Sequence, residues 1–139
     1  MTVSSEPPAV RVGTVLPELV IEADPTFVIS SALATRDFQD VHHDRDKAVA
    51  RGSKDIFVNI LTDTGLVQRF VTDWAGPRAV MKSVAVRLGV PLYAGDTLRL
   101  TGMVTALDGD DIHIDVVGKD SLGDHIKASV VITVRRVHD

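Results

Sequence analysis

The sequence contains no cysteine, and that absence excludes several kinds of chemistry. Without thiols the chain forms no disulfide, has no cysteine nucleophile and offers no sulfur ligand to zinc. Its 139 residues must therefore be held together by a hydrophobic core, and an apolar share of 45% is enough for a single domain of this length. The absence is also compatible with a reducing cytoplasm.

Long apolar runs and an excess of positive charge are missing too. No run approaches the roughly 18 residues that a bilayer-spanning helix needs, and Glu6, Pro7 and Pro8 stand where a signal peptide would be apolar. Fifteen basic residues face nineteen acidic ones, for a net charge of −4, and the two signs alternate along the chain. We expect a soluble, cytoplasmic protein that binds no nucleic acid and no membrane.

Composition divides the chain into a tail and one domain. Residues 1–10 hold two serines, a glutamate and two adjacent prolines, which predicts a flexible tail, because such a segment buries too little apolar area to offset its ordering entropy. Residues 11–139 are expected to form the single domain. Within it, an extended piece is expected over residues 11–19, and the β-branched and aromatic run at residues 26–30 predicts a strand.

Residues 36–55 form a polar connection that is long for a small domain. Twelve of these twenty residues are charged or histidine, and one short helix is expected around residues 44–50. Long ordered loops of this kind tend to be functional.

A long helix is predicted between Asn59 and the pair Gly76-Pro77. Apolar side chains recur at helical intervals, namely Ile60, Leu66, Val67, Phe70, Val71 and Trp74. Asn59 is a suitable N-cap, because its side-chain oxygen can accept a hydrogen bond from a first-turn amide, and Gly76-Pro77 ends the helix. The wide apolar arc indicates that much of this helix is buried.

After Pro77 the apolar residues alternate with polar ones over four segments, separated by turn signals near residues 95–96, 108–111 and 122–124. Four strands in meander order predict an antiparallel sheet. Together with the long helix they give an α+β plan, the hot-dog fold, in which the antiparallel sheet wraps around one long central helix. One such domain leaves part of its helix uncovered, so we expect two domains to pair.

Two side chains in the polar connection, Asp37 and His42, suit acid–base chemistry. A carboxylate and an imidazole that face one pocket can hold a water molecule and remove its proton as the oxygen attacks carbon. These residue types favour hydration of an activated alkene.

Residues 35–44, Thr-Arg-Asp-Phe-Gln-Asp-Val-His-His-Asp, resemble the hydratase-2 motif of MaoC-like enoyl-CoA hydratases. That motif reads Ser/Thr, Gly, Asp, any residue, Asn, Pro, aliphatic, His, any residue, Asp. The resemblance implies that Asp37 and His42 activate the water and that Asp44 is structural. Three positions depart from the motif, with Arg36, Gln39 and Asp40 in place of Gly, Asn and Pro.

A second family element is a glycine at the start of the central helix, whose backbone N–H donates to the thioester oxygen. Residues 56–61, Ile-Phe-Val-Asn-Ile-Leu, are similar to that segment, with Asn59 at the position of the glycine. The resemblance implies that the backbone N–H of Asn59 polarises the thioester, and every residue except proline keeps this donor. The helix N-terminus would add partial positive charge beside a developing enolate.

The resemblance extends over residues 13–137 and is strongest to the small MaoC-like subunits of actinobacterial heteromeric hydratases that act on sterol side chains. It implies conversion of a trans-2-enoyl-CoA to the 3-hydroxyacyl-CoA, with a bulky steroid substrate from sterol (cholesterol) catabolism. It also implies a second MaoC-like subunit, in a heterodimer or heterotetramer, which can be fused to an OB-type acyl-CoA-binding domain. No cofactor is implied, since CoA is part of the substrate.

Two other functions fit the same fold. Hot-dog thioesterases commonly carry an acid on the central helix, and Asp63 could serve as one, although a first-turn acid also complements the helix dipole. The domain could also be a noncatalytic acyl-CoA-binding subunit, against which the presence of both Asp37 and His42 argues.

The remaining polar residues are given no role in catalysis. His42 and His43 stand among acidic residues, but adjacent side chains point apart and lack the i, i+4 spacing of a zinc helix, so no metal site is expected. Three histidines are expected to be ordinary surface or tail residues, namely His113, His125 and His138. Three cations are available for the CoA phosphates but are expected to be solvated, namely Lys54, Lys82 and Arg87.

Overall fold

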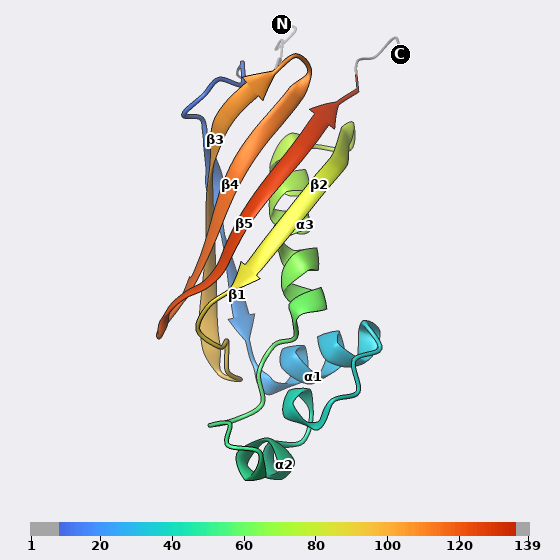
Figure 1. Ribbon diagram of the computed structural model, residues 1–139, viewed down its shortest axis with the longest axis vertical. Coiled ribbons are helices and arrows are strands. Elements are labelled where there is room, and N and C mark those ends of the chain that lie inside the picture. Colours follow the sequence, from blue (N-terminus) through green and yellow to red (C-terminus); the bar gives the residue numbers. More distant parts are fainter. Residues whose placement is uncertain (1–8, 136–139) are drawn as a thin grey trace, which may run out of the picture.

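A computed structural model describes residues 9–135, in which one antiparallel sheet curves around a long helix (Figure 1). Most of the expected tail, residues 1–8, and the C-terminal residues 136–139, which include His138, lie outside the described residues. The strands are β1 (Val15–Ala23), β2 (Ala79–Leu88), β3 (Asp96–Asp108), β4 (Asp111–Asp120) and β5 (Gly123–Val134). The helices are α1 (Pro25–Ala34), the 3-10 turn η1 (Asp40–His42), α2 (Arg45–Ala50) and α3 (Ile60–Ala75).

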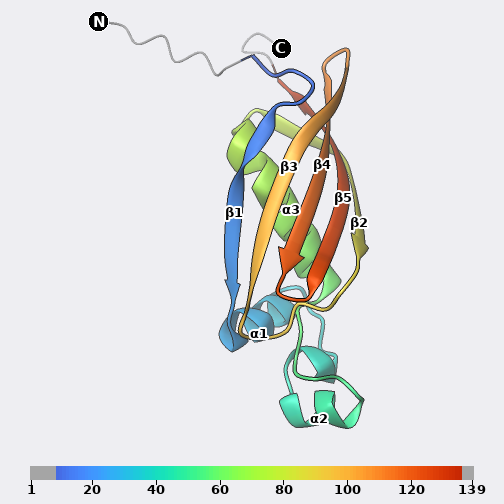
Figure 2. The same ribbon diagram turned by 90° about the vertical axis from the view of Figure 1, so that its left-hand side faces the viewer.

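The hot-dog architecture is confirmed, since α3 lies on the concave face of the five-stranded sheet (Figure 2). Buried side chains of α3 pack against the inward-facing residues of the strands, among them Leu100, Ile114 and Val130. Gly102 permits this close approach, because a Cβ there would lie 2.8 Å from the ring of Phe70. None of the helices in residues 9–135 combines the length and the apolar character that a membrane crossing requires.

The order of the strands corrects one part of the prediction. The sheet runs β1-β3-β4-β5-β2, so the last three strands form the expected meander, but β2 pairs with β5 instead of with β3, which follows it in the chain. The physical reason lies in residues 89–95, which cross the end of the sheet. Gly89 N donates to His125 O at 2.9 Å and Ala94 N to Ile56 O at 3.0 Å, so the segment is tied to other elements and makes no tight hairpin turn.

The strand expected at residues 26–30 is wrong, because these residues lie in α1. Asp24 caps this helix through a 2.7 Å hydrogen bond from Phe27 N to its carboxylate, and Pro25 occupies the first helical position, where its fixed φ is favourable. The Asp-Pro pair therefore begins a helix instead of preceding a strand. Buried Val28 packs in the core, so tertiary packing offsets the low helix propensity of the β-branched residues.

The C-terminus of α1 is a Schellman motif that leads directly into Asp37. Arg36 N donates to Leu33 O at 3.0 Å and Asp37 N donates to Ala32 O at 2.9 Å. Arg36 has a φ of 57°, in the left-handed region where glycine is favoured. The hydratase-2 motif has glycine at this position, and the backbone gives the reason for that preference.

We predict that Arg36→Gly raises the free energy of unfolding by about 0.5–1 kcal/mol. Relief of the left-handed strain of about 1–2 kcal/mol exceeds the entropy that glycine adds to the unfolded chain. Urea denaturation measures the change. Arg69→Gly, in the interior of α3, is the matched control and should lower stability by about 1 kcal/mol. A destabilised Arg36→Gly variant would contradict this account.

Candidate active site

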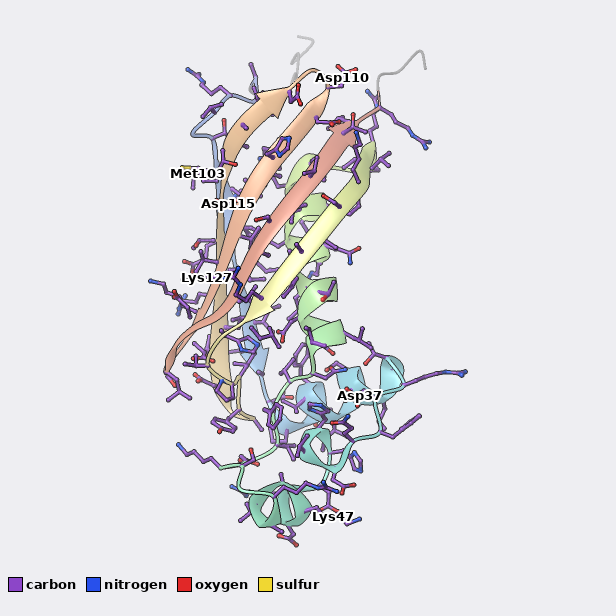
Figure 3. The ribbon with its side chains drawn as sticks, in the orientation of Figure 1. Asp37, Lys47, Met103, Asp110, Asp115 and Lys127 are labelled. Atoms are coloured by element: carbon purple, nitrogen blue, oxygen red, sulfur yellow. The ribbon has the colours of Figure 1, made fainter. Side chains whose placement is uncertain are left out.

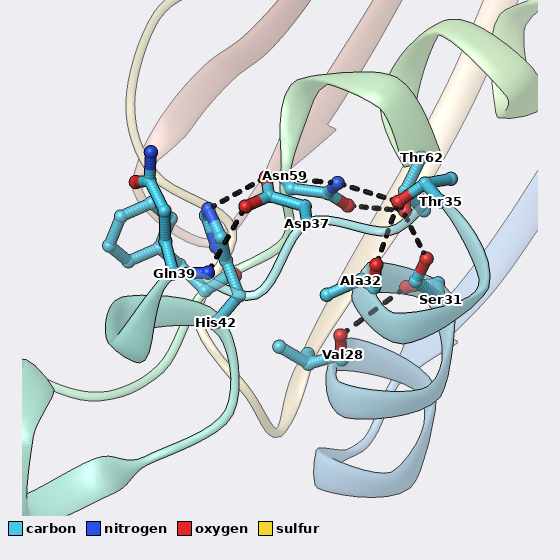
Figure 4. A network of polar contacts seen from close by, with 10 residues as sticks. Val28, Ser31, Ala32, Thr35, Asp37, Gln39, His42, Asn59 and Thr62 are labelled. Carbon is cyan, nitrogen blue, oxygen red and sulfur yellow. Dashed lines mark hydrogen bonds and ion pairs between the residues drawn. The ribbon is translucent and has the colours of Figure 1, made fainter.

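Asp37 and His42, which the sequence analysis singled out, come together at the end of the sheet where α1, η1 and the start of α3 meet (Figures 3 and 4). Asp37 is placed by the turn that ends α1, and the 3-10 turn η1 carries His42 back toward it. His42 Nε2 lies 3.4 Å from Asp37 Oδ2. The imidazole is buried, whereas 21% of the Asp37 side chain is exposed.

The other ring nitrogen of His42 fixes how the imidazole is protonated. Nδ1 lies 2.7 Å from the backbone oxygen of Phe57, and a carbonyl can only accept, so Nδ1 carries the hydrogen. In the neutral ring Nε2 is then an acceptor that faces Asp37. The edge-on contact of the Phe57 ring, with centroids 4.9 Å apart, and the bond from Phe57 N to Val41 O hold the two segments together.

Asn59 precedes α3, but its side chain does not cap the helix, so the predicted side-chain N-cap is wrong. Its oxygen accepts from the hydroxyl of Thr62, and its Nδ2 donates to Thr35 Oγ1 at 2.9 Å and to Asp37 Oδ2 at 3.3 Å (Figure 4). The side chain thus points back to the acid. Within residues 9–135 nothing accepts a hydrogen bond from the backbone N–H of Asn59.

A cavity of about 440 Å³ joins these three residues. Its wall is completed mainly by apolar and small residues, together with the polar residues Gln39 and His125. The full lining is Asp37, Gln39, His42, Phe57, Val58, Asn59, Ile60, Leu88, Gly89, Val90, Pro91 and His125. Two acceptors, a free backbone donor at a helix N-terminus and an apolar wall therefore share one space.

His125 and Asp63 form a buried pair beside this cavity, which corrects the expected surface position of His125. Asp63 lies in the first turn of α3, as expected. The side chains of His125 and Asp63 are 2% and 0% exposed, with Nε2 of His125 2.9 Å from Oδ2 of Asp63. A bulge where β4 and β5 shift register, between Gly118 and Lys119, leaves His125 as an extra residue and turns its side chain inward.

Both ring nitrogens of His125 face acceptors, since Nδ1 lies 2.6 Å from Val90 O. Burial alone would lower the pKa of His125, but the hydrogen bond and charge of Asp63 and the Val90 carbonyl raise it above the ordinary value. Burial raises the pKa of the Asp63 carboxyl, against the opposing effect of His125. The structure thus commits the Asp63 carboxylate to His125, and Asp63 does not line the cavity.

The other residues of the polar connection have structural roles. Asp44 caps α2, accepting from Lys47 N at 3.1 Å, and the short helix lies where the sequence predicted it. Asp40 bonds Arg51 at 2.9 Å, and this hydrogen bond lowers the pKa of the Asp40 carboxyl. No three metal-ligating side chains gather anywhere in the part of the chain that is described.

The three candidate cations for CoA phosphates do not meet at this cavity. Lys82 pairs with Asp111 at 2.8 Å, and Lys54 lines a different hollow. Arg87 lines a hollow of about 490 Å³ on the outer face of the sheet, where Asp115 also lies, well apart from Asp37 (Figure 3).

Comparison with known proteins places the chain in a family. No protein-family profile matches the chain. It is 67% identical, over 124 residues, to the 3-oxo-4,17-pregnadiene-20-carboxyl-CoA hydratase beta subunit of Mycobacterium tuberculosis. The aligned region covers 89% of this chain and 96% of that protein. The chain belongs to the MaoC-like enoyl-CoA hydratases.

Solved structures agree with this assignment. The hydratase superposes on a chain of the ChsH1-ChsH2 complex from M. tuberculosis with a TM-score of 0.90 and 65% identity, covering 91% of this chain and 100% of that one. An (R)-hydratase from A. caviae involved in PHA biosynthesis has a TM-score of 0.84 at 16% identity, over 93% of this chain and 100% of that one, and shares the fold.

We predict that the hydratase loses stability as pH rises from about 6.5 through the raised pKa of His125. The folded protein then holds a proton that the unfolded chain has released. Each pKa unit by which folding raises the pKa of His125 corresponds to about 1.4 kcal/mol of folding free energy. The raised pKa of Asp63 gives a loss of stability of the same sign that begins at lower pH, above the ordinary carboxyl value of 3.8. Urea denaturation from pH 6 to pH 9 measures the slope.

The control for this prediction is the double variant Asp63→Asn with His125→Gln, which removes both titrating groups at nearly constant volume. Its free energy of unfolding should change less over the same pH range. Parallel profiles for the two proteins would show that the pair does not carry the proton assigned to it.

Proposed function

We propose that Asp37 and His42 of this hydratase add water to the double bond of a trans-2-enoyl-CoA thioester, producing the 3-hydroxyacyl-CoA. The observation that carries the proposal is the convergence of His42 Nε2 and Asp37 Oδ2, 3.4 Å apart, at the wall of a cavity. Family membership supplies the reaction class, and this geometry supplies the groups that perform it.

The two groups suit one water molecule because both accept hydrogen bonds. With Nδ1 of His42 donating to Phe57 O, the unprotonated Nε2 and the Asp37 carboxylate can each accept one hydrogen bond from the same water molecule. The water oxygen then keeps its lone pairs free to attack carbon 3 of the enoyl group. Positioned acid–base groups of this kind contribute about 10²–10⁴-fold to the rate.

The addition needs a place for the electrons of the double bond. As the water oxygen bonds to carbon 3, the π electrons move toward the thioester oxygen, and one water proton passes to the dyad. The backbone N–H of Asn59 and the N-terminus of α3 stabilise the enolate oxygen. Return of a proton from the dyad to carbon 2 completes the 3-hydroxyacyl-CoA and restores both side chains.

The substrate we propose is a bulky steroid-linked enoyl-CoA from sterol breakdown. The relative at 67% identity is named for a pregnadiene carboxyl-CoA, which is a steroid thioester. The mouth of the cavity is apolar, since Ile60 and Leu88 line it while remaining 49% and 37% exposed. CoA enters as part of this substrate, and the reaction as proposed uses no separate cofactor.

We also propose that the protein works in the cytoplasm with a second MaoC-like subunit, as a heterodimer or heterotetramer. The similar chain at 65% identity was solved as part of the ChsH1-ChsH2 complex. Exposed apolar side chains near the cavity, among them Leu61 at 53%, suit cover by a partner. An OB-type acyl-CoA-binding domain on that partner would supply cations for the CoA phosphates that this cavity lacks.

We predict that Asp37→Asn and His42→Ala each lower kcat for enoyl-CoA hydration by about 10²–10⁴-fold, because the first replaces a basic carboxylate by a neutral amide and the second removes the imidazole. Loss of absorbance of the conjugated thioester measures the rate. The matched controls Asp46→Asn and His113→Ala replace an exposed acid and a strand histidine outside the cavity, and should keep the wild-type rate.

The four variants should be compared in the assembly in which the wild type is active, with folding checked by circular dichroism. If Asp37→Asn and His42→Ala fold normally and hydrate the thioester at the wild-type rate, the proposed chemistry is wrong. Binding of acyl-CoA without turnover by the wild-type assembly would instead favour a noncatalytic subunit.

A further inference from the structure

The side chain of Asn59 is the best-connected polar group of the site, and the reaction proposed above does not use it. It is 1% exposed, and both of its polar atoms are engaged. The oxygen accepts from Thr62, in the first turn of α3, and the nitrogen donates to Thr35, at the end of α1, and to Asp37. Asn59 thus connects α1, α3 and the candidate base (Figure 4).

The directions of these hydrogen bonds leave one orientation for the amide. The hydroxyl of Thr35 directs its single hydrogen at the carbonyl oxygens of Ser31 and Ala32, both 2.9 Å away, so toward Asn59 it can only accept. A flipped amide would set its oxygen against this acceptor and against the carboxylate of Asp37. Thr62 completes the arrangement by donating to the amide oxygen.

This arrangement decides where the base lies. Asp37 follows the end of α1 and belongs to no helix or strand, and its Oδ1 receives a bond from Gln39 N that is 3.3 Å long, as is the bond from Asn59 Nδ2 to Oδ2. Its Oδ2, which faces His42, is the atom that Asn59 Nδ2 holds. Without that donor the carboxylate could rotate away from the imidazole.

We propose that the side chain of Asn59, oriented by Thr35 and Thr62, is a positioning group that holds the Asp37 carboxylate against His42. The inference rests on the proposed function, because it assigns Asn59 the alignment of that base. A single residue then links the two halves of the reaction, since its backbone N–H faces the thioester oxygen while its side chain aligns the base. A glycine at this position keeps the backbone donor but not the alignment.

The test is a double-mutant cycle on kcat with an enoyl-CoA that the wild-type assembly hydrates. Thr62→Val removes the hydroxyl at nearly constant shape and should lower kcat about 5–10-fold, while KM stays unchanged because Thr62 does not line the cavity. Asn59→Gly should lower kcat at least as much. Adding Thr62→Val to Asn59→Gly should cost nothing further, since both act through the same amide.

Three further variants separate alignment from general damage to α3. Thr62→Ser keeps the hydroxyl and should retain the wild-type rate. Thr64 lies two residues after Thr62 on the same helix, and its exposed hydroxyl donates to Ile60 O. Thr64→Val removes this hydroxyl and should also retain the wild-type rate. Thr35→Val removes the acceptor for Asn59 Nδ2 at the end of α1 and should lower kcat as Thr62→Val does. The test therefore remains decisive if Thr62→Val fails to fold.

The outcomes distinguish this inference from the proposed function. Wild-type kcat in folded Thr62→Val, Thr35→Val and Asn59→Gly, with Asp37→Asn and His42→Ala inactive, would overturn the role of Asn59 and leave the reaction intact. Fully additive losses in the cycle would also overturn it. Full activity in Asp37→Asn and His42→Ala would overturn both.

Discussion

The hydrogen bond between His42 Nδ1 and the backbone oxygen of Phe57 is the contact on which the site depends. It fixes the hydrogen on the nitrogen that faces away from Asp37 and turns the other nitrogen, as an acceptor, toward the carboxylate. It also joins the polar connection to the segment that begins α3, so the proposed dyad and the proposed oxyanion donor, the backbone N–H of Asn59, are held together. The other neutral tautomer would turn a donor toward Asp37 and an acceptor toward the Phe57 carbonyl.

The rest of the fold keeps these segments in fixed positions. The sheet wraps an almost wholly apolar face of α3, and the buried polar groups of the helix, Asn59, Thr62 and Asp63, all lie at its N-terminal end. Two of them connect to the acid of the site and the third to His125. Buried polar networks of this kind specify one geometry when nearly every member is bonded, because an unpaired buried group is costly.

Much of this could be predicted from the sequence, for local reasons. The spacing of Asp37 and His42 indicates the proposed dyad, and the helical period of apolar residues indicates α3. Each of these two signals lies within one short stretch of sequence. A further signal was present but unused: Thr62 and Asp63 stand four residues before Leu66 and Val67, on the buried stripe of the helix, which indicates polar groups facing inward.

Other features depend on contacts between distant segments. The strand predicted at residues 26–30 is a helix because Asp24 and Pro25 begin one there, and burial of Val28 in the core supports it. His125 turns inward only because a bulge interrupts the alternation of β5. The position of the bulge depends on how β5 pairs with β4, so the sequence of β5 alone does not predict it. The bond from Asn59 to Asp37 likewise spans 22 positions of sequence.

The protonation of the His42 ring tests the central claim most directly, and nitrogen NMR of the protein labelled with ¹⁵N at histidine measures it. The account predicts that the neutral ring of His42 carries its hydrogen on Nδ1 and leaves Nε2 unprotonated, with a coupling from Nδ1–H to the Phe57 carbonyl. A neutral ring with its hydrogen on Nε2 would contradict it, because that nitrogen could not accept a proton from water.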